Sequence, residues 1–170
     1  GRLYESQAPA YLRTHPLTTE RIADMENRIQ QRPYRQVVDS LDFLLVRAKL
    51  RAQEGAAEDA VADFGFQLKE HKFASESAVR YGLAQAYLRA GKLPAAAAQM
   101  AELRRLKADS PMVETLAARL RSQAGDTAGA VRLLQAAAAK YPQERAVAYA
   151  LVEALLAAHQ AEAALKAVDA

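Results

Sequence analysis

LPAAAAQM, at residues 93–100, is one of four segments of this chain that share a pattern. The others are AEDAVADF at 57–64, TAGAVRLL at 127–134 and AEAALKAV at 161–168, so the intervals are 36, 34 and 34 residues. Each segment follows a turn position, and these positions are Gly55, Gly91, Gly125 and His159. A repeat of this length predicts a solenoid, in which each unit buries its apolar face only against its neighbours.

The residues within the repeats follow the pattern of a known family. The second repeat has Leu83-Ala84-x-x-Tyr87 on an expected first helix, then Ala96 and Met100 on a second helix. Small residues recur where paired helices approach closely: Ala48, Ala84, Ala118, Ala60, Ala96, Ala130 and Ala164. The region of about residues 41–170 therefore resembles the tetratricopeptide-repeat (TPR) family. The resemblance implies an all-α, right-handed solenoid of antiparallel helix pairs, with about four repeats and a truncated last one.

Capping residues and helix breakers indicate where the helices begin and end. Ser40, Ser75 and Ser110 suit N-caps, and Pro111 suits a first helical turn. First helices of the pairs are expected near 41–54, 76–90, 111–124 and 144–158. Second helices are expected near 57–70, 93–107, 127–140 and 161–169. Because the outer face of the last helix lacks a polar cap, we expect the chain to be cut from a longer protein.

Composition narrows the function classes. Hydrophobic residues make up 51% of the chain but aromatic residues only 6%, which favours Ala- and Leu-rich helices over a sheet. The 23 basic and 20 acidic residues are interspersed, whereas a nucleic-acid-binding protein concentrates its cations on one face. No apolar run approaches the ~18 residues of a membrane span, and no secretory signal opens the sequence. We therefore expect neither a nucleic-acid partner nor a membrane span.

Residues 1–40 fall outside the repeats. We expect an irregular strap there, because Pro16 disfavours helical geometry at His15. A lone helix is expected near 19–31. Its apolar face consists of Ile22, Met25 and Ile29.

A second resemblance covers about residues 1–54. YLRTHPLTTERIADMENR at 11–28, followed by PYRQVVDSLDFLLVRAKLR at 33–51, is similar to a domain junction in the BepA-like zinc metallopeptidases, peptidase family M forty-eight. In that bacterial family a protease domain precedes a C-terminal TPR array. The resemblance implies that residues 1–40 trail a protease domain missing from this chain. It also implies a periplasmic protein engaged in the assembly and quality control of outer-membrane proteins.

The chain lacks the residues that zinc proteolysis requires. The family's H-E-x-x-H motif places two zinc ligands one helical turn apart, with the glutamate as general base. The only histidines are His15, His71 and His159, and none lies in such a motif. We therefore expect no catalytic residue and no cofactor in this chain, with zinc confined to the full-length parent. The resemblance implies that His15 can be an extra zinc ligand there, and the alternative is packing at the junction.

The resemblance also implies a protein- or peptide-binding groove. In TPR arrays a set of positions on each first helix lines the concave face, which here gives Asp42, Leu45, Lys49, Tyr81, Gln85, Leu88, Arg89, Thr115, Arg119, Gln123, Tyr149 and Glu153. Tyr81 and Tyr149 hold the same register two repeats apart. Tyrosine and arginine are frequent anchors of protein interfaces, and the alternative is a merely solvated inner surface.

These observations support one interpretation of the chain's function and leave one alternative. The chain is read as the protein-binding C-terminal TPR module of a periplasmic zinc metallopeptidase, contacting the parent's protease domain and a bound protein. The rival is a free-standing bacterial TPR scaffold or adaptor with no protease domain. The residues leave the identity of the bound protein and the oligomeric state open.

Overall fold

A computed structural model describes residues 18–30 and 37–168. Every regular element in these two ranges is an α-helix, which confirms the all-α prediction for the part described. The chain divides into two compact units, Gly1–Val38 and Asp39–Ala170.

The first unit contains the predicted lone helix, α1 (Thr18–Gln30). Within this helix Arg28 forms an ion pair with Asp24, one turn earlier, at 2.9 Å. Ile22, Met25 and Ile29 form an exposed apolar stripe along it. His15 lies outside the described residues.

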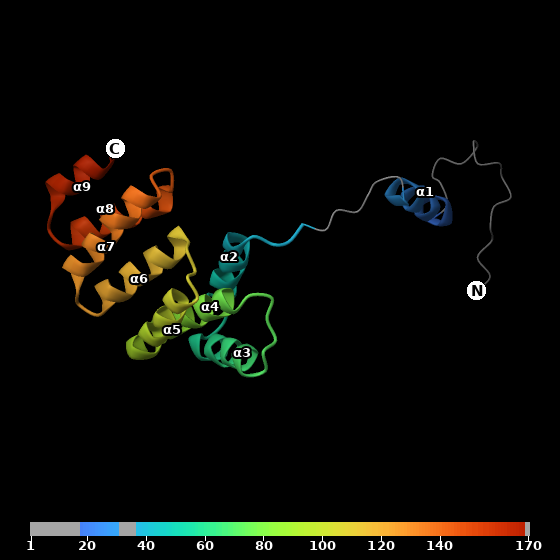
Figure 1. Ribbon diagram of the computed structural model, residues 1–170, viewed down its shortest axis with the longest axis horizontal. Helices are drawn as coiled ribbons and strands as arrows, with labels where there is room; N and C mark the ends of the chain where they lie inside the picture. The colour runs from blue at the N-terminus through green and yellow to red at the C-terminus, as the bar shows by residue number, and fades with distance from the viewer. Residues whose placement is uncertain (1–17, 31–36, 169–170) are drawn as a thin grey trace. The chain divides into compact units, whose positions relative to one another are not determined.

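The second unit is a solenoid of helix pairs. Its helices are α2 (Leu41–Arg51), α3 (Ala57–Lys69), α4 (Glu76–Arg89), α5 (Leu93–Arg105), α6 (Pro111–Gln123), α7 (Thr127–Lys140), α8 (Arg145–Ala157) and α9 (Ala161–Val168). Figure 1 shows that they follow one another through the unit, so that α2 and α3 lie at one end and α8 and α9 at the other. These bounds agree with the predicted ones to within about three residues at each helix end.

The predicted caps and turns explain where these helices begin. The side chains of Ser40, Ser75 and Ser110 accept hydrogen bonds from backbone N–H groups in the first turns of α2, α4 and α6, at 3.2, 3.3 and 3.3 Å. All four predicted turn positions adopt positive φ: Gly55, Gly91, Gly125 and His159. A left-handed residue reverses the chain between the helices of a pair, and glycine adopts that conformation without a steric cost.

Small side chains allow the paired helices to pack. α4 packs against α5, α6 against α7 and α8 against α9, while α2 packs mainly against α4. Ala84, Ala96 and Ala130 are almost fully buried at these helix crossings. Gly82 of α4 lies directly under the ring of Phe64 from α3. The buried core consists of two clusters, one formed by α2 to α6 and the other by α6 to α9, and both include residues of α6.

Both ends of the solenoid expose apolar side chains. Phe43, Val46 and Leu50 lie exposed on α2, and Leu165 and Val168 lie exposed on α9. Among the described residues, no helix is both long enough and apolar enough to cross a membrane.

Candidate binding groove

A groove of about 400 Å³ runs across the first helices of the pairs. It is lined from α2, α4, α6 and α8, with a contribution from α7 between the last two. The predicted groove residues that line it are Lys49, Tyr81, Gln85, Thr115, Arg119 and Glu153. The structure thus brings half of the predicted set together in one concave site.

The repeat itself explains why these residues share a face. Lys49, Gln85, Arg119 and Glu153 recur at intervals of 36, 34 and 34 residues, which are the intervals of the repeated segments. Each is therefore at the same register of its own first helix, on α2, α4, α6 and α8 in turn. Side chains at one register point the same way in successive repeats, so the four project into a common groove.

Two buried polar side chains, Tyr81 and Gln85, belong to the groove wall. Their exposed fractions are 2% and 7%, and the Gln85 side-chain N–H donates to the Tyr81 hydroxyl at 2.9 Å. Burial raises the pKa of the Tyr81 phenol, against smaller opposing effects of the Gln85 hydrogen bond and the Arg119 charge. The phenol therefore stays neutral and keeps its proton near neutral pH.

This pair retains unused hydrogen-bonding capacity. No other described residue donates a hydrogen bond to Gln85 Oε1, and none accepts one from the Tyr81 hydroxyl. Within the described residues no fully buried side-chain polar atom lacks a partner. Because Gln85 Oε1 has no protein partner in the described part of the chain, this atom reaches the groove surface, and Tyr81 lines the same groove beside it.

Three exposed charges surround this pair. Lys49 and Arg119 are cationic, Glu153 is anionic, and all three line the groove. None of them forms an ion pair with another residue in the described ranges. Most other Arg side chains of the second unit are engaged, for example Arg80 with Glu76 at 2.7 Å. The groove therefore offers charges that are free to pair with a bound molecule.

The alanines of α8 create much of the hollow. Ala146, Ala150 and Ala157 line it at helical spacing around Glu153, opposite Leu116 of α6 and with Leu134 of α7 beside them. The sequence prediction missed these alanines and Ser122. The alanines could have been found from the sequence, because small residues recur at intervals of three and four along the first helix expected near 144–158.

The structure corrects three predicted groove residues. Leu45 and Leu88 are 0% and 4% exposed and belong to the core, because neighbouring helices cover their side of the first helix. Arg89 does not line the groove: its guanidinium donates to the carbonyl of Ala52 and, at 2.8 Å, to that of Gly55. It closes the turn after α2 and is therefore not free to bind a carboxylate.

The remaining predicted residues lie outside the groove lining. Asp42 accepts a hydrogen bond from the Ser110 hydroxyl at 2.9 Å. Gln123 and Tyr149 are exposed but do not line the hollow. Tyr149 is 67% exposed, in contrast to Tyr81 at 2%, so the two tyrosines are not equivalent anchors.

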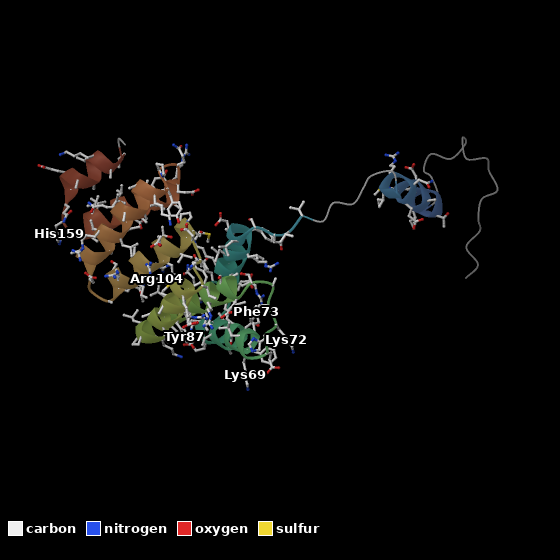
Figure 2. All side chains as sticks on the ribbon, in the orientation of Figure 1. Lys69, Lys72, Phe73, Tyr87, Arg104 and His159 are labelled. Carbon is white, nitrogen blue, oxygen red and sulfur yellow. The ribbon has the colours of Figure 1, made fainter. Side chains whose placement is uncertain are left out.

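Two of the three histidines lie within the described residues. His71 and His159 each occupy a connection between helices with positive φ, and Figure 2 labels His159 in the turn before α9. Across residues 18–30 and 37–168, no three His, Cys, Asp or Glu side chains are grouped so that they could hold a metal ion. The described residues do not fit a zinc ion, and no chemical step is assigned to one.

The fold is an all-α solenoid of helix pairs with a groove across the first helices. Over 88 residues the chain is 36% identical to a protein of Vibrio cholerae described as a beta-barrel assembly-enhancing protease. The aligned segment covers 50% of this chain and 18% of that protein, so the chain spans less than a fifth of the relative's length. No protein-family model matches the chain, and no solved structure gives a significant match. The chain is thus related over half its length to a protease of this kind.

Proposed function

We propose that this chain is a protein-binding TPR module from the C-terminal part of a periplasmic zinc metallopeptidase. The parent acts in the assembly and quality control of outer-membrane proteins, and the module holds a polypeptide beside the protease domain. The observation that carries the proposal is the groove, in which Tyr81, Gln85 and Arg119 lie on adjacent first helices. The similarity to the Vibrio cholerae protease supports the link to outer-membrane assembly.

The groove has the chemistry of a protein-binding site. It is open along successive first helices, a shape that accepts an elongated polypeptide. Its walls combine apolar side chains with Tyr and Arg, the residue types that contribute most to protein interfaces. Zinc in the parent's protease domain would supply the hydrolytic chemistry, and no residue of this chain takes part in bond cleavage.

The test is the affinity of the purified chain for an unfolded outer-membrane β-barrel protein, diluted from urea and followed by fluorescence anisotropy. Arg119→Ala is expected to weaken binding about tenfold. Arg132→Ala, on an exposed position of α7 that does not line the groove, is the matched control and is expected to leave affinity unchanged. Tyr81→Phe is the suitable tyrosine variant, because Tyr81→Ala would leave a cavity in the core.

A second ligand, an unfolded soluble helical protein of similar length, tests whether binding is specific for β-barrel proteins or is that of a general scaffold. Preference for the β-barrel protein supports the proposed role in outer-membrane assembly. Equal affinity for both proteins would favour the free-standing scaffold. Absence of binding to either protein would contradict a protein-binding function altogether.

A further inference from the structure

We infer that the groove binds an extended peptide segment with acidic side chains over α2 and α6, a bare peptide unit over α4 and a basic side chain over α8. This rests on the proposed protein-binding function and names the class of segment that is bound. Lys49, Arg119 and Glu153 provide the three charges, and the Tyr81–Gln85 pair provides the contact with the main chain.

The Tyr81–Gln85 pair points to an extended ligand. Along an extended chain the N–H donor and C=O acceptor of one residue point to the same side, and the pair offers one spare hydroxyl donor and one spare amide acceptor. An extended segment leaves both of its main-chain groups free, whereas a helix uses them internally. Because Tyr81 and Gln85 are almost fully buried, they are held rigidly and give a bound peptide a defined position.

The order of the groove charges determines the order of the charged residues along the bound segment. Four successive first helices each place one side chain at the same register of the groove: Lys49, Gln85, Arg119 and Glu153. From α2 to α8 these side chains are a cation, an amide, a cation and an anion. Packed helices lie roughly 8–10 Å apart and an extended chain rises about 3.3 Å per residue, so one helix step corresponds to about three peptide residues. The complementary segment therefore places two acidic residues about six positions apart and a basic residue about three positions beyond.

Glu153 also argues against a terminal carboxylate as the ligand. A chain that ended with its carboxylate at Arg119 would leave the anion of Glu153 next to a negative end, with no cation to pair with it. A continuing segment that carries a basic residue satisfies both charges. The ligand is therefore inferred to continue past Arg119 toward α8.

The test uses fluorescein-labelled synthetic peptides of about ten residues with both ends capped, at low ionic strength. The first has two glutamates and a lysine at the spacing above. The second reverses every charge, and the third is uncharged along its length but ends in a free carboxylate. The first is expected to bind about tenfold more tightly than either of the others. Equal affinity for the first two peptides, or tightest binding of the third, would overturn the inference.

Charge-reversal variants locate the contacts. Lys49→Glu with Arg119→Glu is expected to exchange the preference, so that the charge-reversed peptide binds more tightly. Lys69→Glu with Arg132→Glu is the matched control, because both positions are exposed and neither lines the groove. Figure 2 labels Lys69 on α3. An exchange of preference in the control pair, or none in the groove pair, would contradict the assignment.

Tyr81→Phe isolates the main-chain contact. It is expected to weaken the first and second peptides by the same factor, about three- to tenfold, because the lost hydrogen bond does not depend on peptide charge. Unchanged affinity would contradict main-chain recognition. If the unfolded β-barrel protein still binds but the peptides show no charge preference, this inference fails while the proposed function stands.

Discussion

The hydroxyl of Ser110 donates a hydrogen bond to a carboxylate oxygen of Asp42, 2.9 Å away, although 68 positions separate the two residues. Ser110 is 1% exposed, and its own hydroxyl oxygen accepts a hydrogen bond from the backbone N–H of Met112 at 3.3 Å. One side chain therefore caps α6 and ties it to the start of α2.

Ser110→Ala is expected to lower the free energy of unfolding by about 2 kcal/mol, because it removes both the cap of α6 and the hydrogen bond to Asp42. Ser40→Ala, which removes only an exposed cap, is expected to cost about 1 kcal/mol. Urea denaturation of Ser110→Ala, Asp42→Ala and the double variant measures the coupling between the two residues. Strictly additive effects would show that the hydrogen bond contributes nothing.

Gly82→Ala is expected to destabilise the chain by about 1–3 kcal/mol, although alanine favours a helix. A Cβ at Gly82 would lie 2.4 Å from the ring of Phe64, which is 2% exposed and would have to shift. Gly65→Ala is the matched control, because a Cβ there meets nothing within 4 Å. The control is expected to stabilise by about 0.5–1 kcal/mol, and equal effects at both glycines would contradict the close approach of α3 and α4.

Arg89→Ala is expected to destabilise the chain by about 1–2 kcal/mol while leaving affinity for the unfolded β-barrel protein unchanged. Its guanidinium donates to two backbone carbonyls after α2, so its role is structural. Arg89→Met retains the aliphatic stem and separates the hydrogen bonds from the packing. A loss of affinity without a loss of stability would restore Arg89 to the groove.

Asp126 is expected to make stability fall in acid. The hydrogen bond from the Gly129 backbone N–H, and then that from Arg121, hold the pKa of this carboxyl below its ordinary value of 3.8. A lowered folded-state pKa means that the stabilisation is complete above pH 3.8 and is lost as pH falls through the lower value.

Asp126→Asn retains a capping oxygen but removes the charge. The urea midpoint of the wild type should exceed that of the variant near neutral pH, and the difference should shrink as pH falls below 3.8. Glu144→Gln is the control, because Glu144 precedes α8 without a side-chain cap hydrogen bond. A constant difference between wild type and Asp126→Asn at every pH would contradict the linkage.

Local signals made the fold predictable. The serines at 40, 75 and 110 and the turn glycines act within a few residues of their own position, so the sequence alone indicated where helices begin and reverse. Lys49, Gln85, Arg119 and Glu153 were among the groove residues that the TPR resemblance implied, and all four line the groove. Such features depend on the repeat and not on the detailed packing.

Burial could not be predicted in the same way. Tyr81 and Tyr149 hold the same register, yet only Tyr81 is covered, because it lies inside the array and Tyr149 lies in the last pair. The hydrogen bond between Ser110 and Asp42 joins different repeats, and no local sequence pattern predicts it. Arg89 was misassigned because its acceptors are backbone carbonyls, which a comparison of side chains overlooks.

The most direct measurement of the central claim is site-specific photo-crosslinking between this chain and the unfolded outer-membrane β-barrel protein. A photoreactive phenylalanine is introduced at Ala150 or Ser122 in the groove, and at Gln135 or Lys69 outside its lining. Adducts are expected from the two groove positions and none from the outer positions. The capped peptide with two glutamates and a lysine is expected to suppress the groove adducts. Adducts from Gln135 or Lys69 alone, with none from the groove, would show that the binding face lies elsewhere.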